Sequence, residues 1–165
     1  MLCKAEKDKN NRYFINLLLA GIAVLASCKQ KSGSNYKMSD AEMFSAKLQQ
    51  YKIIDEMAVE ALMSYDTVSQ QEYLKTLKET VLPDWVDCVD LMDESKNLVI
   101  SLPLKEDLRA ALKLYASHRI EETKIMIRMY EEKEMAYKKS LDSMRQLIIQ
   151  AKESIIQKER LLQMK

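Results

Sequence analysis

Glycine is absent from residues 36 to 165, and this absence limits the possible folds of the chain more than any other feature of its sequence. The whole chain has only two prolines, Pro83 and Pro103. Tight β-turns and phosphate-binding loops need glycine, asparagine or proline at defined positions, so sheets and barrels have few turn residues available. Apolar residues make up 47% of the chain and charged residues 31%, which excludes a disordered tail. The sequence therefore predicts an all-α protein.

Two capping boxes mark expected helix starts. Ser39 precedes Glu42 by three residues, and Ser69 stands in the same relation to another glutamate. In this spacing the hydroxyl and the carboxylate satisfy free amides of the first helical turn. Apolar residues then recur every three or four positions, which is the period of one helix face. The two stripes are Phe44, Leu48, Tyr51, Ile54, Ala58, Ala61 and Tyr65, and Leu74, Leu77, Val81, Trp85, Cys88 and Met92. Pro83 is expected to kink or restart the second helix, because proline lacks a backbone donor.

The chain from residue 104 to residue 165 contains no helix breaker and can form one helix or two. One helix would be about 90 Å long. Its apolar stripe changes phase, however, and residues 131–138 between the two phases are mostly charged, so we expect the chain to reverse there. The prediction is an antiparallel up-and-down bundle of four helices. The alternative is a three-helix bundle with one very long C-terminal helix.

The first 28 residues have the pattern of an export signal. A polar start with four basic residues precedes an apolar segment, residues 13–25, that is shorter than the roughly 20 residues a membrane span requires. The segment ends in Leu25-Ala26-Ser27-Cys28, which resembles the lipobox of bacterial lipoproteins. The resemblance implies that Cys28 is acylated and becomes the first residue after cleavage. The alternative is an ordinary secretory signal followed by a chance cysteine.

This resemblance also implies a domain organisation and a location. Residues 1–27 would be the cleaved signal peptide, residues 28–38 the lipidated cysteine with a flexible tether, and residues 39–165 the helical bundle. Two or three acyl chains would make the membrane the first partner, because one chain alone binds weakly. Lys29, in place of aspartate, implies the outer membrane of a Gram-negative cell. The segment 29–31 lacks the acidic residues that mark cell-surface export, so a periplasm-facing position is expected.

Cleavage would remove four of the 26 basic and two of the 25 acidic residues, which leaves the mature chain close to neutral. No nucleic-acid partner is therefore expected. Cys3 would leave with the signal and Cys28 would carry lipid, so Cys88 has no intramolecular cysteine to pair with. We expect Cys88 to be a small buried apolar residue, with an intermolecular disulfide as the alternative.

His118, Arg119 and Glu122 interrupt the apolar stripe next to Tyr115. Spacings of three and four residues allow these side chains to touch on one helix face. One interpretation is a buried polar site for a ligand or a metal, and the other is a structural polar pair that fixes helix register. Metal sites in bundles use several inward carboxylates and Glu-x-x-His spacing. His118 is the only histidine of the chain, so neither a metal nor a cofactor is expected.

The sequence contains no nucleophile and base at motif spacing and no phosphate loop, so we expect no catalytic residues and no enzyme. The predicted function is that of a lipid-anchored, periplasm-facing bundle that acts as a protein-interaction or envelope-structural module, with a partner of unknown identity. Charge supports this hypothesis: residues 70–95 hold seven acids and two lysines, and residues 137–165 seven bases and three acids. The alternative is a small-molecule or metal sensor, which requires a cavity of several hundred Å³ beside the polar residues of the bundle core.

Overall fold

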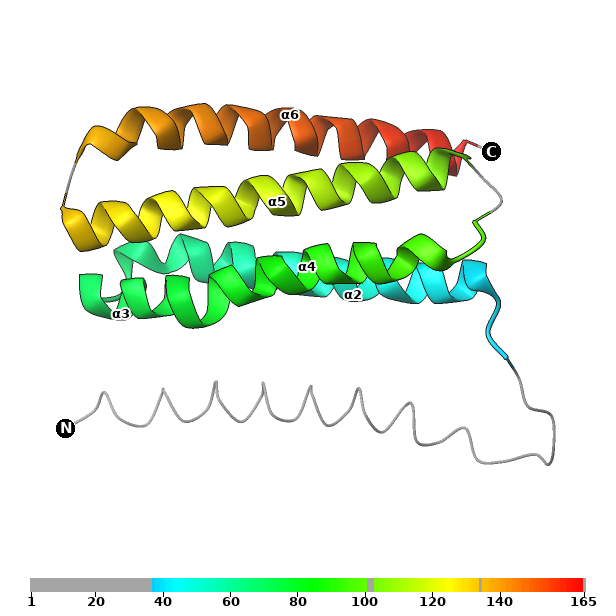
Figure 1. The fold of residues 1–165 in the computed structure, drawn as a ribbon, viewed down its shortest axis with the longest axis horizontal. Coiled ribbons are helices and arrows are strands. Elements are labelled where there is room, and N and C mark those ends of the chain that lie inside the picture. Colours follow the sequence, from blue (N-terminus) through cyan, green and yellow to red (C-terminus); the bar gives the residue numbers. More distant parts are fainter. Residues whose placement is uncertain (1–36, 101–102, 134, 165) are drawn as a thin grey trace, which may run out of the picture. The chain divides into compact units, whose positions relative to one another are not determined.

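The computed structural model describes residues 37–100, 103–133 and 135–164. The predicted signal peptide, the lipobox with Cys28 and most of the tether lie outside these residues. The chain from Met38 onward forms one compact unit, and its described part is helical without any β-strand (Figure 1). Four helical segments pack against one another in this unit. No helix in the described ranges is both long enough and apolar enough to cross a membrane.

The first segment, α2 (Asp40–Leu62), begins at the predicted capping box. Ser39 Oγ accepts a hydrogen bond from the Glu42 amide at 3.3 Å, and the Glu42 carboxylate accepts one from the Ser39 amide at 2.8 Å. The inward stripe is buried or half-buried up to Leu62. Tyr65, expected to continue this stripe, is exposed. The prediction for Tyr65 is wrong because α2 ends before it and a 3₁₀ turn, η1 (Met63–Asp66), changes the side-chain period.

The second segment runs through four elements without a break in its helical path. These are α3 (Gln70–Thr76), the π-turn η2 (Leu77–Val81), α4 (Leu82–Glu94) and the short 3₁₀ turn η3 (Ser95–Asn97). Ser69 and Glu72 form the second capping box. Pro83 has no amide to donate, and the turn just before it is widened so that the Leu82 amide donates to the Leu77 carbonyl oxygen. The interruption expected at Pro83 therefore takes the form of a π-turn that ends at Val81, two residues before the proline.

The remaining chain forms two helices. These are α5 (Pro103–Glu132) and α6 (Lys138–Gln163), and the 3₁₀ turn η4 (Met135–Tyr137) lies between them. Lys133 follows α5 in the left-handed region, with a φ of 54°. The predicted break within residues 131–138 is confirmed, and the alternative of one very long C-terminal helix is wrong. The physical reason is the phase change in the apolar stripe, which a single straight helix would leave partly facing water.

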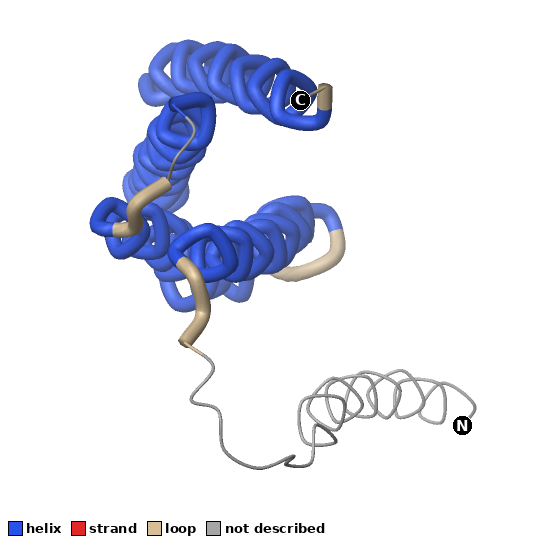
Figure 2. Tube along the Cα trace, turned by 90° about the vertical axis from the view of Figure 1, so that its right-hand side faces the viewer, coloured by secondary structure: helices blue, strands red, loops and turns tan. Residues whose placement is uncertain are grey.

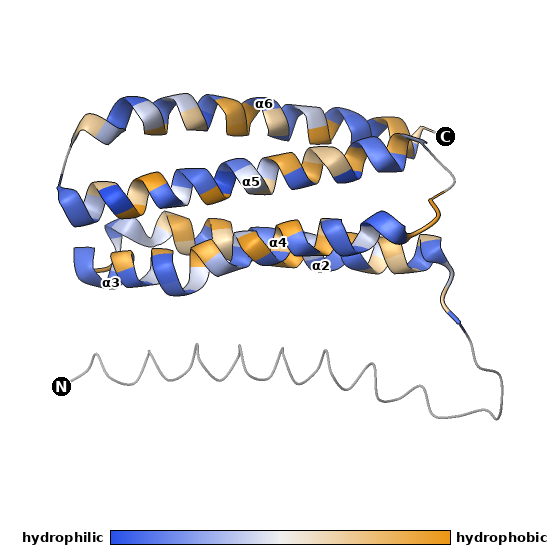
Figure 3. Ribbon diagram, viewed as in Figure 1, coloured by the Kyte–Doolittle hydropathy of each residue, from blue (hydrophilic) through white to orange (hydrophobic). Residues whose placement is uncertain are grey.

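The helices are arranged around an open side. α5 packs against α6 and against α4, and α2 packs against α4. Viewed along the helices, they follow the order α6, α5, α4, α2 (Figure 2). Apolar and polar stripes alternate on each helix (Figure 3), and the core centres on Trp85, which is 0% exposed. A salt bridge of 2.7 Å between Lys52 Nζ and Glu159 Oε1 joins α2 to α6.

Candidate functional site

Glu122 is a charged residue in the interior of the bundle, with only 2% of its surface exposed. Its Oε2 accepts a hydrogen bond from Arg119 Nη1 at 2.7 Å, one turn earlier in α5. Its Oε1 accepts one from Arg145 Nε of α6 at 3.2 Å. Burying a carboxylate is costly unless it is paired and hydrogen-bonded. The two arginines meet this requirement, one on each oxygen.

Arg119 is fixed from several sides. Its Nε donates to the Tyr115 hydroxyl oxygen at 3.1 Å. Its guanidinium carbon lies 5.3 Å from the ring centroid of Tyr115 and 5.6 Å from that of Trp85, so the cation rests on two aromatic faces. Burial acts to lower the pKa of Arg119, but Tyr115 and Glu122 outweigh burial and raise it. Arg119 is therefore a fixed positive charge inside the bundle.

Asp55 of α2 extends this arrangement, because its carboxylate lies close enough to Arg119 and Tyr115 to interact with both. Burial raises the pKa of Asp55, and the Arg119 charge and the neighbouring Tyr115 side chain act in the opposite direction. Its Oδ1 is buried and has no hydrogen-bond partner within the described ranges. Asp55, Tyr115, Arg119, Glu122 and Arg145 thus form one connected set, which we call the core polar network. It links α2, α5 and α6.

The structure brings together three of the four residues predicted for this site, namely Tyr115, Arg119 and Glu122. His118 is half-buried, and in the described part of the chain it makes no hydrogen bond or ion pair. The sequence analysis missed Asp55 and Arg145, which join from other helices. A usable signal existed, because each of them adjoins the apolar stripe of its own helix.

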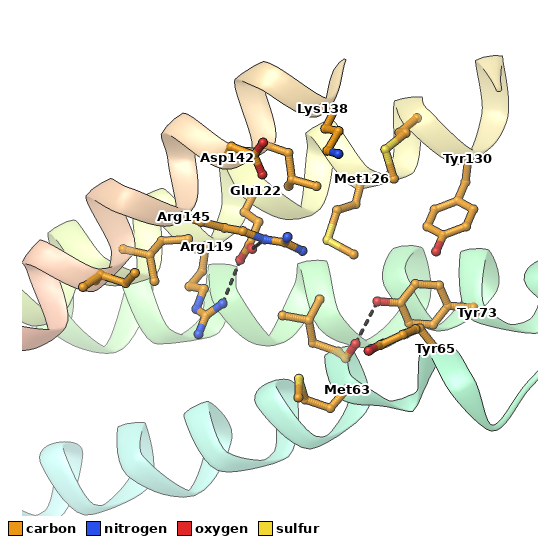
Figure 4. A pocket seen from close by; sticks show the side chains of 15 residues that line it. Met63, Tyr65, Tyr73, Arg119, Glu122, Met126, Tyr130, Lys138, Asp142 and Arg145 are labelled. Atoms are coloured by element: carbon orange, nitrogen blue, oxygen red, sulfur yellow. Dashed lines mark hydrogen bonds and ion pairs between the residues drawn. The ribbon is translucent and has the colours of Figure 1, made fainter. Parts of the chain in front are cut away.

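A cavity of about 670 Å³ opens beside the core polar network, among η1, α5 and α6 (Figure 4). Its fifteen lining residues are mostly apolar: Leu62, Met63, Tyr65, Tyr73, Arg119, Glu122, Met126, Met129, Tyr130, Lys138, Leu141, Asp142, Arg145, Ile148 and Ile149. Pockets of this size with a few convergent polar groups are typical of small-molecule sites. The arrangement can therefore accommodate an apolar molecule and contact a polar part of it.

Three tyrosines form one end of this cavity, at a distance from the charged residues (Figure 4). The ring centroids of Tyr65 and Tyr73 are 6.4 Å apart, and those of Tyr73 and Tyr130 are 5.4 Å apart, both in edge-to-face geometry. The Tyr73 hydroxyl donates to the Leu62 carbonyl oxygen at 2.8 Å. Burial raises the pKa of Tyr73 to about 12. Tyr73 is thus held in place at the centre of this tyrosine end.

Cys88 lies in the core at 0% exposure, as predicted, and is not in a disulfide. Burial raises the pKa of its thiol to about 12.

The described ranges contain no group of three or more histidine, cysteine, aspartate or glutamate side chains that could hold a metal ion. The cavity beside the core polar network is thus the candidate functional site. The chain matches no protein-family model, no curated protein and no solved structure.

Proposed function

We propose that this protein is a lipid-anchored, non-catalytic binding protein whose helical bundle takes up a small apolar molecule in the cavity beside the core polar network. The observation that carries the proposal is the cavity itself, with its volume of about 670 Å³ and its mostly apolar wall. The sequence hypothesis of a ligand sensor required such a cavity beside Tyr115, His118, Arg119 and Glu122, and of these Arg119 and Glu122 line it. A binding role is favoured over catalysis because these two charged groups are occupied with each other.

The lipid anchor is part of the same proposal. The lipobox resemblance at Leu25-Ala26-Ser27-Cys28 supports acylation of Cys28 after removal of residues 1–27. The polar segment 29–38 would then give the bundle reach from the outer membrane into the periplasm. An apolar molecule passing between the membrane and the aqueous phase would meet the cavity close to its source.

An antiparallel up-and-down order of the four helices completes the proposal. Ion pairs support it, because residues early in one helix pair with residues late in the next. Early in the second segment, Lys78 pairs with Glu131 at the end of α5, whereas Asp93 pairs with Lys113 near the start of α5. Glu122 and Arg145 lie on either side of the connection between α5 and α6. This order would place the cavity at one end of the bundle.

Replacing Cys28 with serine is expected to abolish acylation and the cleavage after residue 27, because the thiol is the acyl acceptor. The variant should keep residues 1–27 and should not reach the outer membrane, where two or three acyl chains would anchor the wild-type protein. The check is fractionation of native cells together with mass spectrometry of the purified chain. Cys88→Ser is the matched control and should leave both membrane location and lipid mass unchanged. An unprocessed wild-type chain that still carries residues 1–27 and no lipid would contradict the anchor.

Binding of the neutral fluorescent probe N-phenyl-1-naphthylamine tests the cavity. We expect one probe to bind per chain with a strong rise in fluorescence, because the probe moves from water into a cavity with mostly apolar walls. Met126→Trp, which fills the cavity from α5, should remove this binding, whereas Leu114→Trp on the exposed face of the same helix should not. Equal binding by both variants, or none by the wild-type chain, would overturn the proposed function.

A protein-interaction module remains the second candidate, and charge favours it. The acidic residues 70–95 and the basic residues 137–165 belong to segments that are separated by α5. Because these opposite charges do not neutralise each other at a shared contact, they can orient an approaching charged partner. α6 also exposes four large apolar side chains: Leu147, Ile149, Ile156 and Leu161. This candidate becomes the stronger one if the cavity takes no probe.

A further inference from the structure

The charged residues around the cavity do not balance. Three cations line it, namely Arg119, Lys138 and Arg145, against the two carboxylates of Glu122 and Asp142. A positive charge near an apolar wall attracts an anion more strongly than it would in bulk water. The cavity therefore favours a ligand that carries one negative charge.

Arg145 is the cation that can receive this charge. Whereas Arg119 is occupied by Glu122, Tyr115 and two aromatic faces, Arg145 donates one hydrogen bond within the described ranges, from Nε to Glu122. Its side chain is 52% exposed and extends from α6 into the cavity (Figure 4). The Nη groups of an arginine present two donors with the geometry of a carboxylate. Arg145 is thus positioned to bind a carboxylate while it stays paired with Glu122.

The rest of the cavity suits an alkyl chain. Apart from its charged side chains and tyrosines, the cavity wall is made of leucine, isoleucine and methionine side chains, among them Met126, Met129 and Leu141. Methionine is flexible and adapts to chains of different shape. A flat polar ligand would leave this wall without apolar contacts, whereas an extended hydrocarbon would cover it.

We propose that the cavity binds a single-chain amphiphile with a carboxylate head, of the fatty-acid type, with the head on Arg145 and the chain directed toward Tyr65, Tyr73 and Tyr130. One negative charge on the head matches the one excess positive charge among the charged residues that line the cavity. The inference rests on the proposed function and names the class of ligand for the same cavity.

Titration calorimetry with decanoate on the full-length chain carrying Cys28→Ser tests the inference. We expect one decanoate per chain, and we expect Arg145→Gln to weaken it about tenfold or more, the usual effect of losing a hydrogen bond to a charged group. Arg160→Gln, an exposed arginine of the same helix outside the cavity, is the matched control and should bind decanoate like the parent chain. Because Arg145 is half-exposed, its replacement should leave the fold intact, which circular dichroism checks.

Three further ligands test separately how much the carboxylate head and the alkyl chain contribute to binding. Decan-1-ol and decyltrimethylammonium should bind at least tenfold more weakly than decanoate by the same hydrogen-bond argument, and acetate should not bind measurably. Equal binding of decan-1-ol, or no effect of Arg145→Gln, would overturn the role of the carboxylate. Binding of N-phenyl-1-naphthylamine without binding of decanoate would overturn this inference and leave the proposed function in place. Failure of both ligands would overturn both.

Discussion

Replacing Glu122 with alanine is expected to lower the free energy of unfolding by about 3–5 kcal/mol, the range found when one partner of a buried ion pair is removed. Glu122 is almost fully buried, and its main partner Arg119 has a side chain only 15% exposed. Without the carboxylate, Arg119 would remain in the interior without its ion-pair partner. Equilibrium unfolding in urea, followed by far-ultraviolet circular dichroism, measures the loss.

Arg145→Ala is the control for this prediction. It removes the second ion-pair partner of Glu122, but that partner is half-exposed and water screens its charge. We expect a loss below about 1 kcal/mol, as for other exposed pairs. Equal losses in Glu122→Ala and Arg145→Ala would show that the cost does not arise from leaving Arg119 unpaired. A negligible loss in Glu122→Ala would contradict the burial of this carboxylate.

Trp85→Ala is expected to destabilise the protein by about 3–5 kcal/mol, because it removes the largest side chain of the core and leaves a cavity. The indole packs edge-to-face against Tyr115, with ring centroids 6.1 Å apart, and carries Arg119 on its face. Its loss would therefore also remove one support of the core polar network. Urea unfolding followed by circular dichroism is the measurement, since the variant lacks tryptophan fluorescence.

Two further variants test whether the cost of Trp85→Ala comes from the lost side-chain volume. Trp85→Phe keeps most of the ring and removes the indole Nε1, which is buried without a hydrogen-bond partner in the described ranges. Its cost should be clearly smaller than that of Trp85→Ala, because no hydrogen bond is lost. Val86→Ala, at the exposed neighbouring position, should stay within about 0.5 kcal/mol of the wild-type chain. A Trp85→Ala variant as stable as Val86→Ala would contradict the packing around the indole.

Local signals in the sequence predicted most of the helical structure. Ser39 and Ser69 determine helix starts through bonds to residues three positions later, and such bonds need no tertiary context. The same holds for Tyr115, Arg119 and Glu122, which lie on one face of one helix. Their contacts follow directly from helical geometry.

Features that depend on two or more helices could not be predicted in this way. Asp55 and Arg145 reach the core polar network from α2 and α6, so their roles depend on how the helices pack. The cavity is the space left between such packed surfaces, and no residue pattern within one helix encodes it. Tyr65 continues the apolar period of the sequence, but α2 ends before Tyr65, which lies in the following 3₁₀ turn.

The π-turn before Pro83 has a consequence for the angular register of the second segment. Tyr73, Leu77, Val81 and Trp85 are all fully buried although they are spaced four residues apart. In a regular α-helix three such steps drift by about 120°, which would carry the first residue away from the last. The π-turn holds more residues per turn than an α-helix, and this offsets the angular drift. All four side chains therefore stay on the same buried face of the segment. Insertions or deletions between residues 77 and 81 would therefore rotate one half of this helix against the other.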